Sequence, residues 1–303
     1  MRLLACWLML VLTSTSGAAP LHRFLQQLGA AEKIVKLLLD RHANPNLGRP
    51  VSDATRDPSI LRMILDAGAD IDASDEFGRT ALSFAADLGN LKGLQLLLDR
   101  GARVDAVRVS GFDFLSNAPL VLASSNGHED IVQTLLAAGA NVNGEDNRCV
   151  TALEEASLFG HHKVVQMLIH AGADVNSCNA HGQSALWIAS ERGDHKTAQI
   201  LIDAGADINS QNNTGITPLQ NATASAGARV LRVLLTSGAD QLALLREYHG
   251  HANPLCAILH SRVPRPWYRD ADCWQVVQVL LHHLSTEIKQ ALLADTFWDV
   301  SQN

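Results

Sequence analysis

The sequence predicts an all-α solenoid of stacked helix-turn-helix repeats, with short β-turn fingers between them and a helical cap at the C-terminus. Two strings that recur in step predict this class. The first reads Gly-Ala, then Asp, Asn or Arg, then Val or Ile, then Asn or Asp; it begins at Gly68 and returns after 33, 38, 33 and 33 residues, with a partial copy at Gly238. The second, such as Thr80-Ala81-Leu82, precedes each later glycine by 21 residues. An aromatic content of 5% agrees, because it is low for an all-β sandwich or barrel.

One period, residues 180–209, is long enough for two short helices. We expect Ser184 to cap the first helix, because its hydroxyl can accept a hydrogen bond from an amide of the first turn, and Gly193 to end it. A second amphipathic helix follows and ends at Gly205, after which residues 207–209 are expected to run out as a short extended arm. Two such helices cannot bury their apolar stripes alone, so neighbouring repeats must stack on one another.

The period of 33 residues, the Thr-Ala-Leu or Thr-Pro-Leu helix start and the Leu-Leu-x-x-Gly-Ala-Asp-Val-Asn end resemble ankyrin repeats. The resemblance covers roughly residues 19–245, more loosely the rest, and implies about seven to eight repeats. The boundaries that we expect are 19–46 (degenerate), 47–72 (shortened), 73–105, 106–143 (with a finger insertion), 144–176, 177–209 and 210–245, followed by 246–303 as a divergent repeat and C-terminal cap. Cys149 stands where three other fingers carry glycine, so we expect its finger to turn differently.

The N-terminal segment 1–18 admits two interpretations. Arg2, a ten-residue apolar stretch and the small residues before Ala19 are typical of a signal peptide. Alternatively, this segment is a helix of a preceding repeat that packs on the array. The first interpretation predicts a secreted protein and the second a cytoplasmic or nuclear one. Two sequons, at Asn212 and Asn221, barely change that balance, and the second falls inside an expected helix.

The composition and the motifs argue against several other classes. A formal charge of −7 does not favour a general nucleic-acid or anionic-membrane binder, and no apolar run is long enough to span a bilayer. The five cysteines form no CxxC pair, and no phosphate-binding loop, dinucleotide fingerprint or nucleophile elbow occurs. Histidine pairs such as His282-His283 are expected to be surface groups. We therefore expect no enzyme activity, no cofactor and no bound metal, and a monomeric chain.

The resemblance to ankyrin repeats implies a protein-binding scaffold whose fingers and inner helix faces contact an unidentified partner protein. We carry these contact positions over to this sequence one by one and give particular weight to large apolar groups where the fold does not need them. The residues selected in this way are Phe77, Arg79, Leu88, Phe112, Phe114, Arg148, Leu158, Phe159, His181 and Arg192. Phe112 and Phe114 have an alternative role, which is to pack the longer finger against its neighbour. Trp187 is expected to serve packing. The competing function is an adaptor or regulatory subunit that docks through the C-terminal insertion 262–270.

Overall fold

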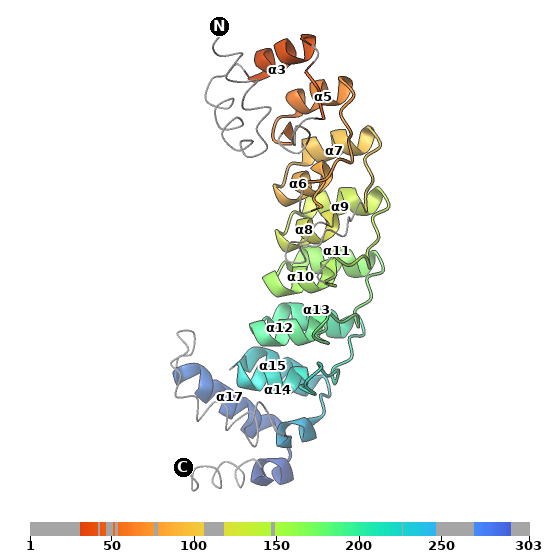
Figure 1. Ribbon diagram of the computed structural model, residues 1–303. Helices are drawn as coiled ribbons and strands as arrows, with labels where there is room; N and C mark the ends of the chain where they lie inside the picture. The colour runs from red at the N-terminus through yellow and green to blue at the C-terminus, as the bar shows by residue number, and fades with distance from the viewer. Residues whose placement is uncertain are drawn as a thin grey trace. The chain divides into compact units, whose positions relative to one another are not determined.

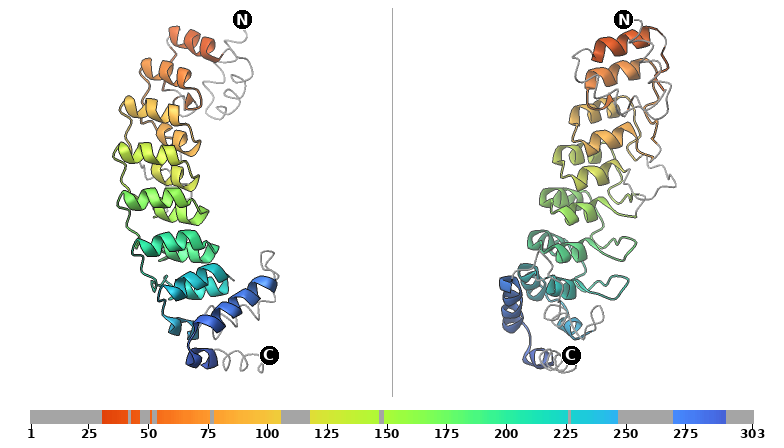
Figure 2. Two further views of the ribbon diagram at one scale, coloured as in Figure 1. Left: turned by 180° about the vertical axis from the view of Figure 1, so that it is seen from behind. Right: turned by 60° about the vertical axis from the view of Figure 1, so that its left-hand side comes forward.

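The computed structural model describes residues 31–41, 43–46, 51, 54–75, 78–105, 118–146, 149–225, 227–246 and 270–291 (Figures 1 and 2). The chain divides into two compact units, residues 1–148 and 149–303. The predictions for segment 1–18, the finger insertion at 107–115, and all but the last residue of the insertion 262–270 lie outside the described residues.

The first unit is a stack of short helices in two rows. The inner row contains α6 and α8, which contact one another, and the outer row contains α5, α7 and α9 in that order, with α3 packed on α5. Their bounds are α3 (Ala31–Asp40), α5 (Pro58–Asp66), α6 (Ala81–Asp87), α7 (Leu91–Asp99), α8 (Pro119–Ser125) and α9 (Glu129–Ala137).

The second unit repeats the two-row arrangement. Here α10, α12 and α14 form the inner row, and α11, α13 and α15 the outer row, on which α17 continues the stack. The bounds are α10 (Ala152–Phe159), α11 (His162–His170), α12 (Ala185–Arg192), α13 (His195–Asp203), α14 (Pro218–Ala224), α15 (Ala228–Thr236), the 3-10 helix η1 (Gln241–Leu245) and α17 (Asp270–His283). Within the described ranges the only β-structure is isolated bridges at the finger bases, so the predicted all-α solenoid class is confirmed.

The recurring Thr-Ala-Leu string performs the two tasks expected of it. Its hydroxyl caps the inner helices other than α8, where Ala118 stands at this position. The Ser184 Oγ accepts from the Trp187 amide at 3.3 Å, and in α10 Thr151 and Glu154 form a reciprocal capping box. Its leucine is the core residue of each repeat, since Leu153, Leu186 and their equivalents are at most 5% exposed. Each unit is therefore held by leucines that become buried only when adjacent repeats meet.

The last residue of the Gly-Ala-Asp-Val-Asn string links one repeat to the next. The side-chain oxygen of Asn176 accepts from the Asp207 amide at 2.7 Å, and that of Asn209 accepts from the Asp240 amide at 2.8 Å. In the first unit Asp72 accepts from the amide of Arg103 in the same way, at 3.0 Å. This position therefore requires a short side chain with an acceptor oxygen, which Asn and Asp provide.

Two local expectations were wrong. Residues 207–209 form a turn rather than an extended arm, because the Asp207 carboxylate folds back to accept from the Asn209 amide at 2.9 Å. The finger at Cys149 does not turn differently at that residue: Cys149 has φ 55°, in the same left-handed region as Gly182 at 71° and Gly215 at 79°. The finger geometry thus imposes this conformation on a residue with a Cβ, at a conformational cost of about 1–2 kcal/mol.

Candidate partner-binding surface

Several predicted residues share one repeat position, the last residue before the glycine that closes each of the inner helices α6, α8, α10 and α12. We call it the helix-closing position, and its members are Leu88, Asn126, Phe159 and Arg192. All four are exposed, Leu88 to 42% and Phe159 to 53%. The reason is geometric: the buried residues of α6 and α10 end at Ala86 and Ser157, so a side chain two positions further along extends beyond the packed row.

Phe159 is the largest apolar side chain at this position. Its ring stacks on the ring of His161, with 6.4 Å between the centroids and 28° between the planes. The next inner helix, α12, contacts α10 and places Arg192 at the equivalent end. The second unit therefore presents an aromatic group and a cationic group at successive helix-closing positions.

The fingers supply a second row of groups in the same unit. His181 is exposed in the finger at 178–184, and that finger is braced by the following one: the Asn213 amide donates to the His181 carbonyl at 3.0 Å, and the Asn213 Nδ2 donates to the Ala180 carbonyl at 2.9 Å. Both fingers project from the helices on the same side (Figure 2, right). His181 thus stands on a finger whose backbone is held by its neighbour.

Arg79 is bound within its own finger. Its guanidinium pairs with Asp75 at 3.0 Å and lies 4.4 Å from the centroid of the Phe84 ring. The Asp75 side chain has no exposed surface, and its carboxylate also accepts from the Arg79 amide. Arg79 therefore stabilises the finger and the start of α6, and only 24% of its side chain is exposed.

Leu158 differs from the other apolar candidates. It is half-buried and packs against the cluster of Trp187, Ile188 and Ile216. The expectation that the fold does not need this side chain was wrong, because it covers one side of the cluster. The packing role expected for Trp187 is confirmed: it is 5% exposed, and its Nε1 donates to the Ile216 carbonyl at 3.1 Å.

The other candidates lie outside the described residues. These are Phe77, Phe112, Phe114 and Arg148. Of the ten residues selected from the sequence, the second unit thus brings Phe159, His181 and Arg192 to exposed positions on adjacent repeats, and the first unit exposes Leu88.

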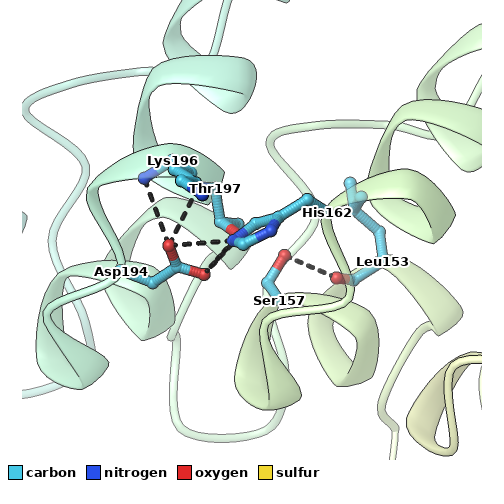
Figure 3. A network of polar contacts seen from close by, with 6 residues as sticks. All are labelled: Leu153, Ser157, His162, Asp194, Lys196 and Thr197. Carbon is cyan, nitrogen blue, oxygen red and sulfur yellow. Dashed lines mark hydrogen bonds and ion pairs between the residues drawn. The ribbon is translucent and has the colours of Figure 1, made fainter.

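A partly buried polar network between outer helices was not anticipated (Figure 3). Asp194 caps α13 by accepting from the amides of Lys196 and Thr197, at 3.1 and 3.3 Å, and from the Thr197 hydroxyl at 2.7 Å. Its carboxylate also contacts the His162 Nε2, at the start of α11, at 2.9 Å. Burial alone would raise the pKa of the Asp194 carboxyl, but the hydrogen bonds from Thr197 and His162 outweigh it and place the pKa below its ordinary value. The sequence holds one indication of this network: His162 and Asp194 are 32 residues apart, which is close to the repeat period and places them in adjacent repeats.

The described residues contain few features that suggest other chemistry. No three His, Cys, Asp or Glu side chains among them converge as a metal site would require. Within the same ranges, no helix combines the length and the apolarity needed to cross a membrane. The sequon residue Asn221 is 5% exposed inside α14, which leaves no room for a glycan on the folded chain.

Comparison with known proteins agrees with this architecture. The family model for ankyrin repeats matches residues 4–108, 51–146, 109–179 and 153–243. The chain therefore belongs to the ankyrin-repeat family, whose members generally mediate protein–protein interactions and act as non-enzymatic scaffolds.

Individual relatives match over one segment only. The chain is 34% identical to the B-cell lymphoma 3 protein homolog of Mus musculus over 113 residues, which are 36% of this chain and 24% of the relative. The chain is also 31% identical to the ankyrin repeat domain-containing protein SAT10 of Stachybotrys chartarum over 114 residues, which are 37% of this chain and 6% of the relative. A third relative, the ankyrin repeat domain-containing protein 63 of Homo sapiens, is 32% identical over 106 residues, which are 32% of this chain and 27% of the relative. The chain thus spans about a quarter or less of the first two of these relatives.

Proposed function

We propose that the protein is a binding scaffold whose partner contacts the helix-closing positions and the fingers, with Phe159, His181 and Arg192 as the contact residues of the second unit. Leu88 holds the helix-closing position in the first unit, and the finger residue Arg79, whose side chain is 24% exposed, is included as a minor contact. Phe77, Phe112, Phe114 and Arg148 belong to the same proposal through their places in the fingers that the sequence predicts.

The exposure of Phe159 is the observation that carries this proposal. A phenylalanine that is 53% exposed, beside a second ring and one repeat from an exposed arginine, supplies the residue types that dominate protein interfaces. Burying that ring against a partner would contribute about 1–2 kcal/mol, because roughly half of its surface is still available for burial.

A partner-capture experiment tests the assignment. The tagged chain is expressed in its native cells, captured proteins are quantified by mass spectrometry, and the same capture is repeated with Phe159→Ser and with Phe159→Ser combined with Arg192→Ser. We expect the single variant to reduce the amount of the specific partner at least several-fold and the double variant to abolish capture, with the thermal midpoint nearly unchanged because both side chains are exposed.

A matched control distinguishes this surface from general apolar adhesion. Leu242 is 58% exposed on η1, away from the helix-closing positions, so Leu242→Ser removes a comparable apolar group and should leave capture intact. Unchanged capture by Phe159→Ser would refute the assigned surface. If deletion of 262–270 abolishes capture while Phe159→Ser does not, the adaptor function through the C-terminal insertion is the correct one.

A further inference from the structure

A surface pocket of about 730 Å³ lies between α15 and α17 in the second unit, and most of the polar side chains that line it are exposed. Its lining includes the buried Ala228 and Val279, and its remaining members are polar or cationic: Arg229, Arg232, Gln275, Gln278, His282 and His283. This volume is within the range of about 300–1,000 Å³ that is typical of small-molecule sites. The cavity lies on the outer row of helices and shares no lining residue with the proposed partner surface.

The charge of the lining is of one sign. Among the described lining residues none is acidic, although the whole chain carries a formal charge of −7. Arg229 and Arg232 are three residues apart on α15, so their side chains emerge on the same face of the helix. In the part of the chain that the structure describes, neither guanidinium pairs with a carboxylate, whereas Arg100 pairs with Asp66 at 2.8 Å.

The opposite wall is held in position by η1. The Gln241 side chain donates to the His283 carbonyl at 3.4 Å and accepts from the Ser285 amide at 3.2 Å, which fixes the end of α17. The rings of His282 and His283 meet edge to face, with 4.8 Å between their centroids. The two imidazoles of α17 and the two guanidinium groups of α15 thus line the same pocket.

The titration of His283 is consistent with a positive electrostatic field at this site. The pKa of His283 is lowered, first by desolvation and then by the positive charges of His282 and Arg232. A further positive charge is therefore disfavoured at the cavity, and the same field favours an anion.

We propose that this cavity binds a phosphate monoester, with Arg229 and Arg232 donating to the phosphate oxygens and the imidazoles of His282 and His283 completing the set of donors. Two guanidinium groups match the charge of a phosphate dianion, and their forked N–H groups match its tetrahedral oxygens. The glutamines and the apolar floor are available to the organic part of the ligand.

The test uses inorganic phosphate as the probe on the full chain. Histidine ring resonances are followed by NMR while sodium phosphate replaces sodium chloride at constant ionic strength. We expect saturable shifts of the His282 and His283 resonances and a rise in the pH at which His283 titrates. The double variant Arg229→Gln/Arg232→Gln should weaken phosphate binding about tenfold or more, because it removes two charge-assisted donors.

Arg62→Gln on α5 is the matched control, because Arg62 is exposed, lies in the first unit and loses the same charge. It should bind phosphate as the unaltered chain does. Equal affinity of the double variant, or the absence of saturable shifts, would overturn the proposal. So would binding of the chain to phosphatidylserine vesicles without any response to phosphate, because that result would assign this face to a membrane surface.

Discussion

Asp194 is a polar side chain whose removal should destabilise the second unit measurably. Three contributions depend on it. The cap of α13 is worth about 1 kcal/mol. The Thr197 hydroxyl is fully buried and donates to Asp194, and leaving it without an acceptor costs about 1 kcal/mol. The contact with His162 contributes less than about 1 kcal/mol, because 36% of the His162 side chain is exposed. Asp194→Ala should therefore lower the free energy of unfolding by about 2–3 kcal/mol.

Asp194→Asn separates these contributions. Asparagine is as good a helix cap as aspartate, but its NH2 group cannot accept from Thr197 or serve as the charged partner of His162. We expect this variant to lose about 1–2 kcal/mol, less than the alanine variant. The difference between the two variants would then separate the contribution of the helix cap from that of the contacts with Thr197 and His162.

The assay is urea unfolding followed by far-UV circular dichroism, with hydrogen exchange of the α11 and α13 amides to locate the loss. Asp203→Ala is the control, because Asp203 is exposed at the other end of α13 and accepts only from the exposed Gln199 at 2.8 Å. It should change stability by less than about 0.5 kcal/mol. If Asp194→Ala costs no more than this control, or if the alanine and asparagine variants are equally unstable, the reasoning from the cap and the network is wrong.

Three further predictions concern the second unit. Folding lowers the pKa of the Asp194 carboxyl below its ordinary value of 3.8, so the carboxylate stabilises the folded chain above pH 3.8 and loses this contribution as the pH falls through its pKa in the folded state. In urea unfolding at a series of pH values, the midpoint of Asp194→Asn should therefore fall less steeply at acid pH than that of the unaltered chain. Cys149→Gly should stabilise the chain by about 0.5–1 kcal/mol, since it relieves a positive φ, and a lower urea midpoint would contradict this. Trp187→Phe should cost about 1–3 kcal/mol, because the Ile216 carbonyl loses its donor in a buried site; unchanged stability in thermal unfolding would show that this hydrogen bond is dispensable.

The recurring strings were sufficient to predict the class of fold. Capping hydroxyls, helix-ending glycines and the core leucines act within one repeat or at a fixed interval, so their roles can be deduced from residue type and spacing alone. The structure confirms this for Ser184, Gly193 and Leu186. The family was indicated by the resemblance of the same strings to ankyrin repeats, and the family model confirms it.

The candidate site was only partly predictable, because exposure depends on what the next repeat contributes. Phe159 and Leu158 are adjacent apolar residues in the sequence, yet one is 53% exposed and the other packs against the Trp187 cluster. Their directions differ by one step around α10, and only the neighbouring repeat decides which direction is covered.

The same physical reason applies to every feature that appeared only in three dimensions. The Asn176 link, the contact between His162 and Asp194, and the cationic cavity beside Arg229 each join residues about 30 to 50 positions apart in the chain. Local patterns determine where a helix begins and ends. The contacts between helices of successive repeats, which depend on packing distances and on charges from two or more repeats, were set by the tertiary structure.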